Sequence, residues 1–258
     1  MRKILLASDL DNTLIHSYKH KREGDICVEM LNGAEQGFMS AKVHAQLSSL
    51  PDNVELVPLT TRSVAQFERI QLPEGCYSRA ITTNGAILIE KGIQNEKWRM
   101  SEKHYADELM PLMEKLRAEL DGNEKLNVVR IVDEMYLYIS CAKPEYVGEF
   151  MDRYSTLTEL DVMLSGRKIY FLPPEINKGK ALKRLAQGEK DAFIFAAGDS
   201  TIDLPMLEAV DLAIIPEALD SLLENPNRSV FKGDGDFAEF VIETLLDKCK
   251  KITIKRHF

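Results

Sequence analysis

Five short apolar runs recur along this chain of 258 residues, and they constrain its fold more than any other feature. They lie at residues 4–8, 54–59, 79–82, 192–197 and 212–215. Nearly continuous apolar runs of this length are typical of strands in a parallel sheet that is covered on both faces.

Helical segments separate these strands. Ser40 and Ser63 stand where they would cap helices at 41–50 and 64–70, and two more helices are expected at 180–186 and 203–209. Strands that alternate with helices indicate an α/β fold, a doubly wound parallel sheet with a Rossmann-like core.

The region 84–172 follows a different pattern and is expected to form an inserted α+β cap domain. A helix and two strands occur in it twice: 104–120, 126–132 and 135–141, then 144–154, 162–165 and 168–172. Pro111 is tolerated only near the start of a helix, which favours a first helix that begins near Asp107. The core is then expected to comprise residues 1–83 and 173–258.

A long excursion follows the first strand, between residues 14 and 40. It contains apolar residues at 26–31, the turn pair Asn32-Gly33, and residues 37–39, a pattern that predicts a hairpin. Such a flap, rooted beside Asp11, would exclude water and touch a substrate, or it would be a surface hairpin with no role in function. The sequence leaves both interpretations open.

Composition excludes several function classes. The net charge is −8 and the pI about 5.3, so neither nucleic acid nor an anionic membrane is an expected partner. Four scattered cysteines form no metal-binding pattern and are expected to be reduced thiols. No apolar stretch approaches the roughly 18 residues of a membrane span, and we expect a cytoplasmic protein.

Two carboxylates end the first strand together. Asp9 and Asp11, in Asp9-Leu10-Asp11-Asn12-Thr13, directly follow the apolar run 4–8. At a strand end, the first carboxylate can attack an electrophile while the second donates a proton. The same residues also have structural interpretations, since an aspartate here can equally cap a turn.

Other polar groups follow the ends of other strands. They are Thr60-Thr61-Arg62 after the second strand, Gly198-Asp199-Ser200 after the run 192–197, and Lys178, which precedes a helix. Ligands of open α/β sheets bind at this edge, so these groups are expected to meet. Oxygen ligands from Asp9, Asp199 and the main-chain carbonyl of Asp11 suit Mg²⁺, and lysine and threonine neutralise a phosphoryl group. Asp203 is expected to cap the helix that follows.

These segments resemble the four motifs of the haloacid dehalogenase (HAD) superfamily of aspartate-nucleophile phosphatases. The motifs stand here as Asp9-Leu10-Asp11-Asn12-Thr13, Thr60, Lys178, and Gly198-Asp199-Ser200-Thr201-Ile202-Asp203. An insert between the second and third motifs resembles the Cof-like and sucrose-phosphatase-like branch. Asn12 and Thr61 depart from that branch, in which glycine is common at both positions.

The resemblance implies a phosphoric monoester hydrolase that uses Mg²⁺. Asp9 would form an aspartyl-phosphate, and Asp11 would protonate the leaving oxygen and later activate water. The residues that would hold the phosphoryl group and substrate are Thr60, the backbone of Thr61, Lys178 and Asn84. The metal site would comprise Asp9, Asp11, Asp199 and Asp203, with Asp203 either a direct ligand or a residue behind the ligands. Asn84 could equally be a simple turn residue.

Alternatives of other classes stay open at this point. A hexose phosphomutase or phosphotransferase would use the same groups, and a regulatory protein could bind phosphorylated metabolites without turnover. A dehalogenase is disfavoured because a halide needs no proton from Asp11. The expected partner is a small phosphorylated metabolite, with sugar phosphates favoured by resemblance. Four aromatic residues of the insert would stack on a sugar or, the favoured interpretation, pack the cap sheet: Trp98, Tyr136, Tyr138 and Tyr170.

Overall fold

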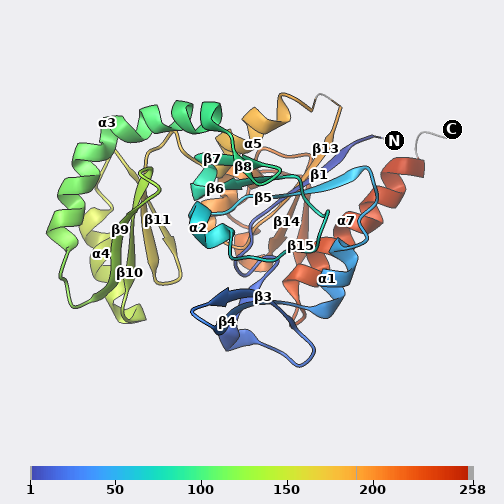
Figure 1. The fold of residues 1–258 in the computed structure, drawn as a ribbon, viewed down its shortest axis with the longest axis horizontal. Coiled ribbons are helices and arrows are strands. Elements are labelled where there is room, and N and C mark those ends of the chain that lie inside the picture. The colour runs from blue at the N-terminus through green and yellow to red at the C-terminus, as the bar shows by residue number, and fades with distance from the viewer. Residues whose placement is uncertain (1, 190, 255–258) are drawn as a thin grey trace.

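A five-stranded parallel sheet forms the centre of the chain, for which a computed structural model describes residues 2–189 and 191–254. Its strands are, in spatial order, β15 (Arg228–Phe231), β14 (Leu212–Pro216), β13 (Phe193–Ala197), β1 (Ile4–Ser8) and β5 (Val54–Pro58). All neighbouring pairs are parallel, so every strand ends at the same edge of the sheet. The expected doubly wound α/β core is therefore confirmed (Figure 1).

Helices cover both faces of this sheet because the strand side chains are apolar on both. One buried cluster joins alternate strand residues such as Leu6 and Phe195 to α1 (Ala41–Leu47) and α7 (Phe237–Ile254). The opposite cluster joins residues such as Leu5 to α5 (Lys178–Ala186) and α6 (Leu204–Leu207). Neither β15 nor α7 is among the elements predicted from the sequence.

The helices that follow the strands differ from prediction mainly at their ends. Ser40 and Ser63 cap α1 and α2 (Val64–Phe67) as expected, and each side chain accepts a backbone N–H. Both helices end about three residues earlier than predicted. The helix α5 begins at Lys178, two residues before the predicted start, because Asn177 caps it by accepting from Lys180 N–H. The segment 203–209 forms only the short α6.

A small antiparallel sheet leads out of the core. It comprises β6 (Arg79–Thr82), β7 (Ile87–Glu90) and β8 (Ile93–Gln94). A parallel bridge between Leu59 and Ile81 connects it to the end of β5. The predicted domain boundary at residue 84 thus falls between two paired strands, and the proposed division of the chain stays a prediction.

The cap contains a four-stranded antiparallel sheet with two helices on one face. Its strands are, in spatial order, β11 (Asp161–Ser165), β12 (Lys168–Leu172), β10 (Tyr136–Cys141) and β9 (Leu126–Val132). The helices α3 (Glu96–Leu120) and α4 (Val147–Tyr154) pack against side chains such as Leu137 and Phe171. The opposite face of the sheet is turned toward the core (Figure 1).

The start of α3 is a correction to the sequence prediction. The helix begins at Glu96 rather than near Asp107, and Pro111 lies inside it. Asn95 caps the helix by accepting from Trp98 N–H at 3.0 Å. The Trp98 indole packs against the core, not the cap sheet, and donates to the carbonyl of Gly85 at 3.0 Å. These contacts fix the start of α3 well upstream of Pro111.

Residues 16–39 form a small separate sheet, the flap. It comprises β2 (His16–Ser17), β4 (Ala34–Met39) and β3 (Ile26–Leu31), and it lies below the core in Figure 1. The turn between β3 and β4 falls at Asn32 and Gly33, which both have positive φ, as a tight hairpin requires. Glu29 forms a bridge with Ile70, which fixes the flap beside α2.

The described residues also contain five 3₁₀ turns: Tyr18–His20, Thr83–Gly85, Pro144–Tyr146, Thr201–Asp203 and Glu217–Leu219. Within these residues no helix has both the length and the apolar character needed to cross a membrane.

Candidate active site

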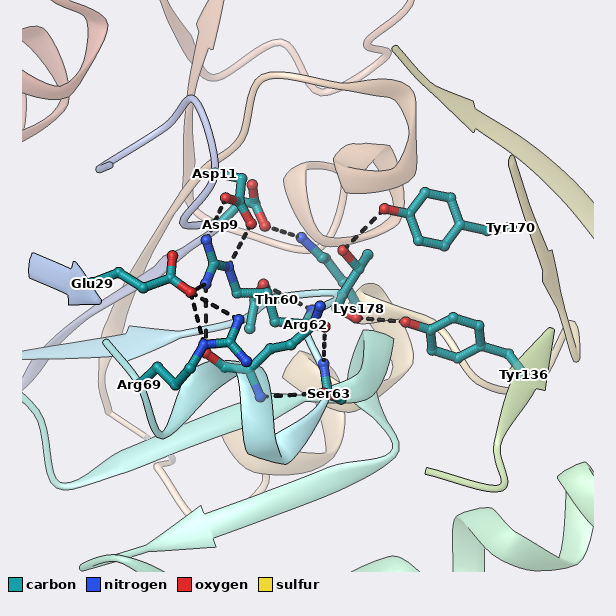
Figure 2. A network of polar contacts seen from close by, with 12 residues as sticks. Asp9, Asp11, Glu29, Thr60, Arg62, Ser63, Arg69, Tyr136, Tyr170 and Lys178 are labelled. Atoms are coloured by element: carbon teal, nitrogen blue, oxygen red, sulfur yellow. Dashed lines mark hydrogen bonds and ion pairs between the residues drawn. The ribbon is translucent and has the colours of Figure 1, made fainter. Parts of the chain in front are cut away.

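A buried lysine lies between two carboxylates at the carboxyl edge of the core sheet. The ammonium of Lys178 donates to Asp9 Oδ1 at 2.6 Å (Figure 2). It also donates to Asp203 Oδ1 at 2.6 Å. Lys178 and Asp203 are fully buried, and Asp9 is 7% exposed. Three segments that are far apart in sequence therefore meet at one point.

Local backbone structure places each of these groups. The N–H of Asp9 donates to Ala197 O at 2.9 Å, so the chain continues the pairing of β1 with β13 as far as Asp9, the expected nucleophile. Asn12 then adopts φ 61°, a left-handed conformation that asparagine tolerates better than most residues. This explains why asparagine can occupy a position at which glycine is common in the family that the chain resembles. Lys178 occupies the first turn of α5, from which its side chain reaches back to the sheet edge.

The loop after β13 holds Asp199 and Asp203. Asp203 Oδ2 accepts from both the N–H and the hydroxyl of Ser200 at 3.0 Å, in a capping box in which Ser200 caps the turn Thr201–Asp203. The prediction that Asp203 caps the following helix is wrong, because its side chain makes no capping hydrogen bond to α6. Gly198 permits this approach, since a Cβ at its position would lie 2.5 Å from the Asp203 Cβ. Asp199 Oδ1 accepts from the Thr13 hydroxyl at 3.2 Å, which joins the first and fourth motifs.

Negative charge exceeds positive charge here. Burial, together with the neighbouring carboxylates and against the attraction of Lys178, raises the pKa of Asp9. Burial and the Asp203 carboxylate raise the pKa of Asp199 to about 6. Burial disfavours charge on Lys178, but Asp203 and Asp9 outweigh it and raise the pKa of the ammonium, which stays charged.

Asp11 is oriented differently from Asp9. Its two carboxylate oxygens accept from Arg62 Nε and Nη2, both at 2.8 Å. Burial would raise the pKa of Asp11, but the guanidinium outweighs it and lowers the pKa. Arg62 in turn contacts Glu29 Oε1 at 2.8 Å, and Arg69 contacts the same oxygen at 2.9 Å. The flap is thereby connected to the candidate proton donor (Figure 2).

Thr60 and Thr61 lie beside Asp9 and Asp11 in a loop that the cap touches. Thr60 is fully buried, and its hydroxyl oxygen accepts from Arg62 N–H at 3.1 Å, which leaves its proton to donate. Tyr136 of the cap donates to Thr61 O at 2.5 Å, and the Tyr170 hydroxyl lies 3.5 Å from Thr61 Oγ1. Figure 2 shows both tyrosines reaching this loop from the cap side.

Asn84 lies immediately behind this loop rather than in the open site. Its N–H donates to Thr60 O at 3.0 Å and its side-chain amide donates to Ile176 O at 3.0 Å. The side-chain oxygen is buried and has no hydrogen-bond partner within the described residues. These contacts of Asn84 therefore join the segments around Thr60 and Lys178.

Asp9, Asp199 and Asp203 form an acidic cluster whose oxygens lie within 4.8 Å of one another. Such a set fits a hard divalent cation, which prefers carboxylate oxygens. The net charge of the site also suits a bound cation. The four carboxylates of Asp9, Asp11, Asp199 and Asp203 contact only two cations, Lys178 and Arg62, so two negative charges remain without a cation among the described contacts.

Sequence reasoning missed the roles of Arg62, Glu29 and Arg69. Arg62 stood within the quoted second motif, and its position directly after a strand end was the available signal. Nothing in the local sequence around Glu29 indicates a contact with Arg62, because it depends on how the flap folds back. Thr13 belongs to the first motif, but the sequence indicated no role for it; in the structure its hydroxyl donates to Asp199.

Comparisons with known proteins identify the fold. No protein-family model matches the chain, and no curated protein matches it in sequence. Solved structures do match over nearly the whole length. The chain has the fold of the haloacid dehalogenase-like hydrolases, as its resemblance implied.

Three of these structures define the likeness. A sucrose-phosphatase from Synechocystis, in complex with sucrose and phosphate, is 19% identical, with a TM-score of 0.64 and coverage of 96% of this chain and 99% of its own. A trehalose-6-phosphate phosphatase related protein is 15% identical, with a TM-score of 0.57 and coverage of 98% and 99%. A haloacid dehalogenase-like hydrolase from B. subtilis is 17% identical, with a TM-score of 0.55 and coverage of 93% and 98%.

Proposed function

We propose that this protein is a Mg²⁺-dependent phosphatase that hydrolyses a small phosphorylated metabolite, such as a sugar phosphate, through an aspartyl-phosphate. The observation that carries the proposal is the meeting of Asp9, Lys178, Asp199 and Asp203 at one sheet edge, with Asp11 and Thr60 beside them. The fold it shares with sugar-phosphate phosphatases supports the same conclusion.

Asp9 is the proposed nucleophile. One carboxylate oxygen attacks phosphorus, the bond from phosphorus to the leaving oxygen breaks, and Asp11 donates a proton to that oxygen. In the second step Asp11 takes a proton from water, which attacks the phosphorus and releases phosphate from Asp9. Lys178 holds Asp9 in position through the 2.6 Å hydrogen bond and contributes positive charge.

The proposed phosphate cradle comprises the Thr60 hydroxyl, the backbone N–H of Thr61 and Lys178. Asn84 is proposed to support this cradle through its contacts to Thr60 O and Ile176 O. Asp9, Asp199, Asp203 and the main-chain carbonyl of Asp11 would hold the cation. When bound, Mg²⁺ would neutralise the excess negative charge and that of the phosphoryl oxygens.

Asp11 must pass between two protonation states in this scheme, and Arg62 stabilises the ionised one. The ionised form is the one that activates water. Arg62 therefore favours the second step, in which Asp11 activates water. In the first step, in which Asp11 donates a proton, the leaving oxygen must displace part of the contact between Asp11 and Arg62. The related mutase reaction would use the same groups, and a product assay separates the two.

The test is phosphate release from an aryl phosphate in Mg²⁺. Asp9→Asn is expected to abolish release, whereas Asp152→Asn, an exposed aspartate of α4, is expected to leave it unchanged. Circular dichroism would verify that both variants fold. Undiminished release by Asp9→Asn excludes the proposed nucleophile. Isomerisation of a hexose monophosphate without free phosphate would indicate a mutase instead.

A further inference from the structure

Two basic side chains lie on the cap face without a direct acidic contact among the described residues. Arg130 of β9 and Lys168 of β12 are exposed and make no ion pair or hydrogen bond within the described residues. The guanidinium of Arg130 lies 5.6 Å from the centre of the Tyr138 ring, which orients it over that ring. Lys125, near the same sheet, instead pairs with Glu149 at 2.6 Å.

Strand register puts both residues on the face that is turned toward the catalytic edge. Arg130 is directly opposite Tyr138, which is opposite Tyr170, and Lys168 is opposite Ser140 on the same face. The other face carries the residues that pack against α3 and α4, such as Leu137. Arg130 and Lys168 therefore share a face with Tyr170, whose hydroxyl approaches Thr61.

One cavity connects these cations to the proposed chemistry. It has a volume of about 120 Å³ and lies between cap and core. Its lining includes Asp11 and Thr61 from the core and Arg130, Tyr138 and Lys168 from the cap. Groups of the proposed reaction centre and both cap cations therefore line the same cavity.

The acidic residues of the cavity are already compensated. Asp11 is paired with Arg62, and Glu29 is shared between Arg62 and Arg69. Neither Arg130 nor Lys168 forms an ion pair with these carboxylates, although the charge of Lys168 helps to lower the pKa of Asp11. Two cations without an ion-pair partner among the described residues, facing a cavity beside a reaction centre, are best satisfied by an anionic group of the substrate.

We infer that the leaving group of the substrate carries a second anionic group, a carboxylate or phosphate, which Arg130 and Lys168 bind while Asp9 attacks the transferred phosphate. The inference rests on the proposed function and sharpens its substrate class to phosphorylated acids, including sugar acids, or bisphosphates. A neutral sugar phosphate would leave both cations unpaired.

Matched substrate pairs test the inference. The first pair is 3-phosphoglycerate and glycerol 3-phosphate, in which a carboxylate replaces a hydroxymethyl group. The second is fructose 1,6-bisphosphate and fructose 1-phosphate, which differ in the second phosphate. We expect kcat/KM to be about tenfold higher or more for the anionic member of at least one pair. The pair that responds identifies the anion as carboxylate or phosphate.

Two variants test whether these side chains cause the preference. Arg130→Gln and Lys168→Gln are each expected to remove most of it, because kcat/KM falls much more for the anionic member of the pair than for the neutral member. Lys143→Gln, a cap lysine that is 60% exposed, is the matched control and is expected to retain the preference. No preference in either pair, or equal losses for both members, would overturn the inference.

A binding measurement separates failure of this inference from failure of the proposed function. Calorimetric titration of the same four compounds into the Asp9→Asn variant measures recognition without turnover. One outcome is that Asp9→Asn prefers an anionic member, that adding Arg130→Gln removes this preference, and that the wild type releases phosphate from no ester. This outcome would contradict only the phosphatase. Release from the aryl phosphate with no binding preference would contradict only the second anionic subsite.

Discussion

Arg62 holds the carboxylate of Asp11 with two parallel hydrogen bonds of 2.8 Å each. A bidentate arginine fixes both the position and the plane of a carboxylate, which a lysine cannot do. The guanidinium is itself held by Glu29 from the flap. The orientation of the proposed acid and base is therefore determined by Arg62 and, through Arg62, by Glu29, a flap residue that lies outside the four motifs.

Replacing Arg62 tests this orientation. Arg62→Gln is expected to lower kcat for an aryl phosphate by about 100-fold, since small displacements of a catalytic group are costly. The control Arg69→Gln removes a contact of Glu29 but none of Asp11, and is expected to alter kcat by less than about threefold. Equal effects of the two changes would indicate that Arg62 acts only through the stability of the flap.

Gly198 is expected to be intolerant of any side chain. A Cβ there would lie 2.5 Å from Asp203 Cβ, so Gly198→Ala should lower the free energy of unfolding by about 1–3 kcal/mol. Gly148→Ala is the matched control, because a Cβ at this exposed position of α4 meets no atom within 4 Å. It should leave stability unchanged or raise it by up to about 1 kcal/mol. Urea unfolding measures both.

The sequence predicted the core sheet well because its strands are buried on both faces and read as continuous apolar runs. The fold class, and the meeting of Asp9 with Lys178, followed from that pattern and the motif order. The edge strand β15 was missed because the short segment Arg228–Phe231 has only partly buried side chains and no such run.

The remaining errors share a physical cause, which is that tertiary contacts override local preference. The helix α3 passes through Pro111 because capping at Asn95 and the anchoring of Trp98 fix its start far upstream. Likewise, Glu29 is 5% exposed only because Arg62 and Arg69 surround it. No local pattern around Glu29 contains that information.

Glu29 is expected to hold the flap against the core. Glu29→Gln leaves two guanidinium groups without their shared carboxylate and should lower the free energy of unfolding by about 2 kcal/mol. Hydrogen exchange at the amides of β3 and β4 should accelerate more than exchange in β1. Glu35→Gln, a flap residue whose side chain is 49% exposed, should change stability by less than about 0.5 kcal/mol. Equal exchange rates in both variants would contradict this role.

Removal of divalent cations is expected to abolish phosphate release and to lower the thermal midpoint. The acidic cluster of Asp9, Asp199 and Asp203 would then repel itself, and the stabilisation by a bound ligand, ~2.7 kcal/mol at 100 times Kd, would be lost. Addition of Mg²⁺ should restore both, and Asp199→Asn should need at least about tenfold more Mg²⁺ for half-maximal rate. Full activity after exhaustive chelation would exclude the metal.

A pH dependence of stability follows from Glu55, far from the catalytic edge. Burial alone would raise the pKa of its carboxyl, but hydrogen bonds from Arg79 and Ser78 outweigh burial and lower the pKa from 4.5 to about 2. A carboxyl whose folded pKa is depressed stabilises the fold above its unfolded pKa, and this contribution is lost as pH falls toward the folded value. The window for Glu55 is therefore from about pH 4.5 down to about pH 2.

Urea unfolding of the wild type and of Glu55→Gln at several pH values tests this window. The variant keeps the side-chain volume but cannot ionise, so its difference in unfolding free energy from the wild type should be constant above about pH 5.5 and shrink steadily below about pH 4.5. The wild type loses the contribution of the ion pair with Arg79, at 2.7 Å, whereas the variant has none to lose. A difference that stayed the same from pH 6 to pH 3 would mean that Arg79 does not hold Glu55 ionised in the folded protein.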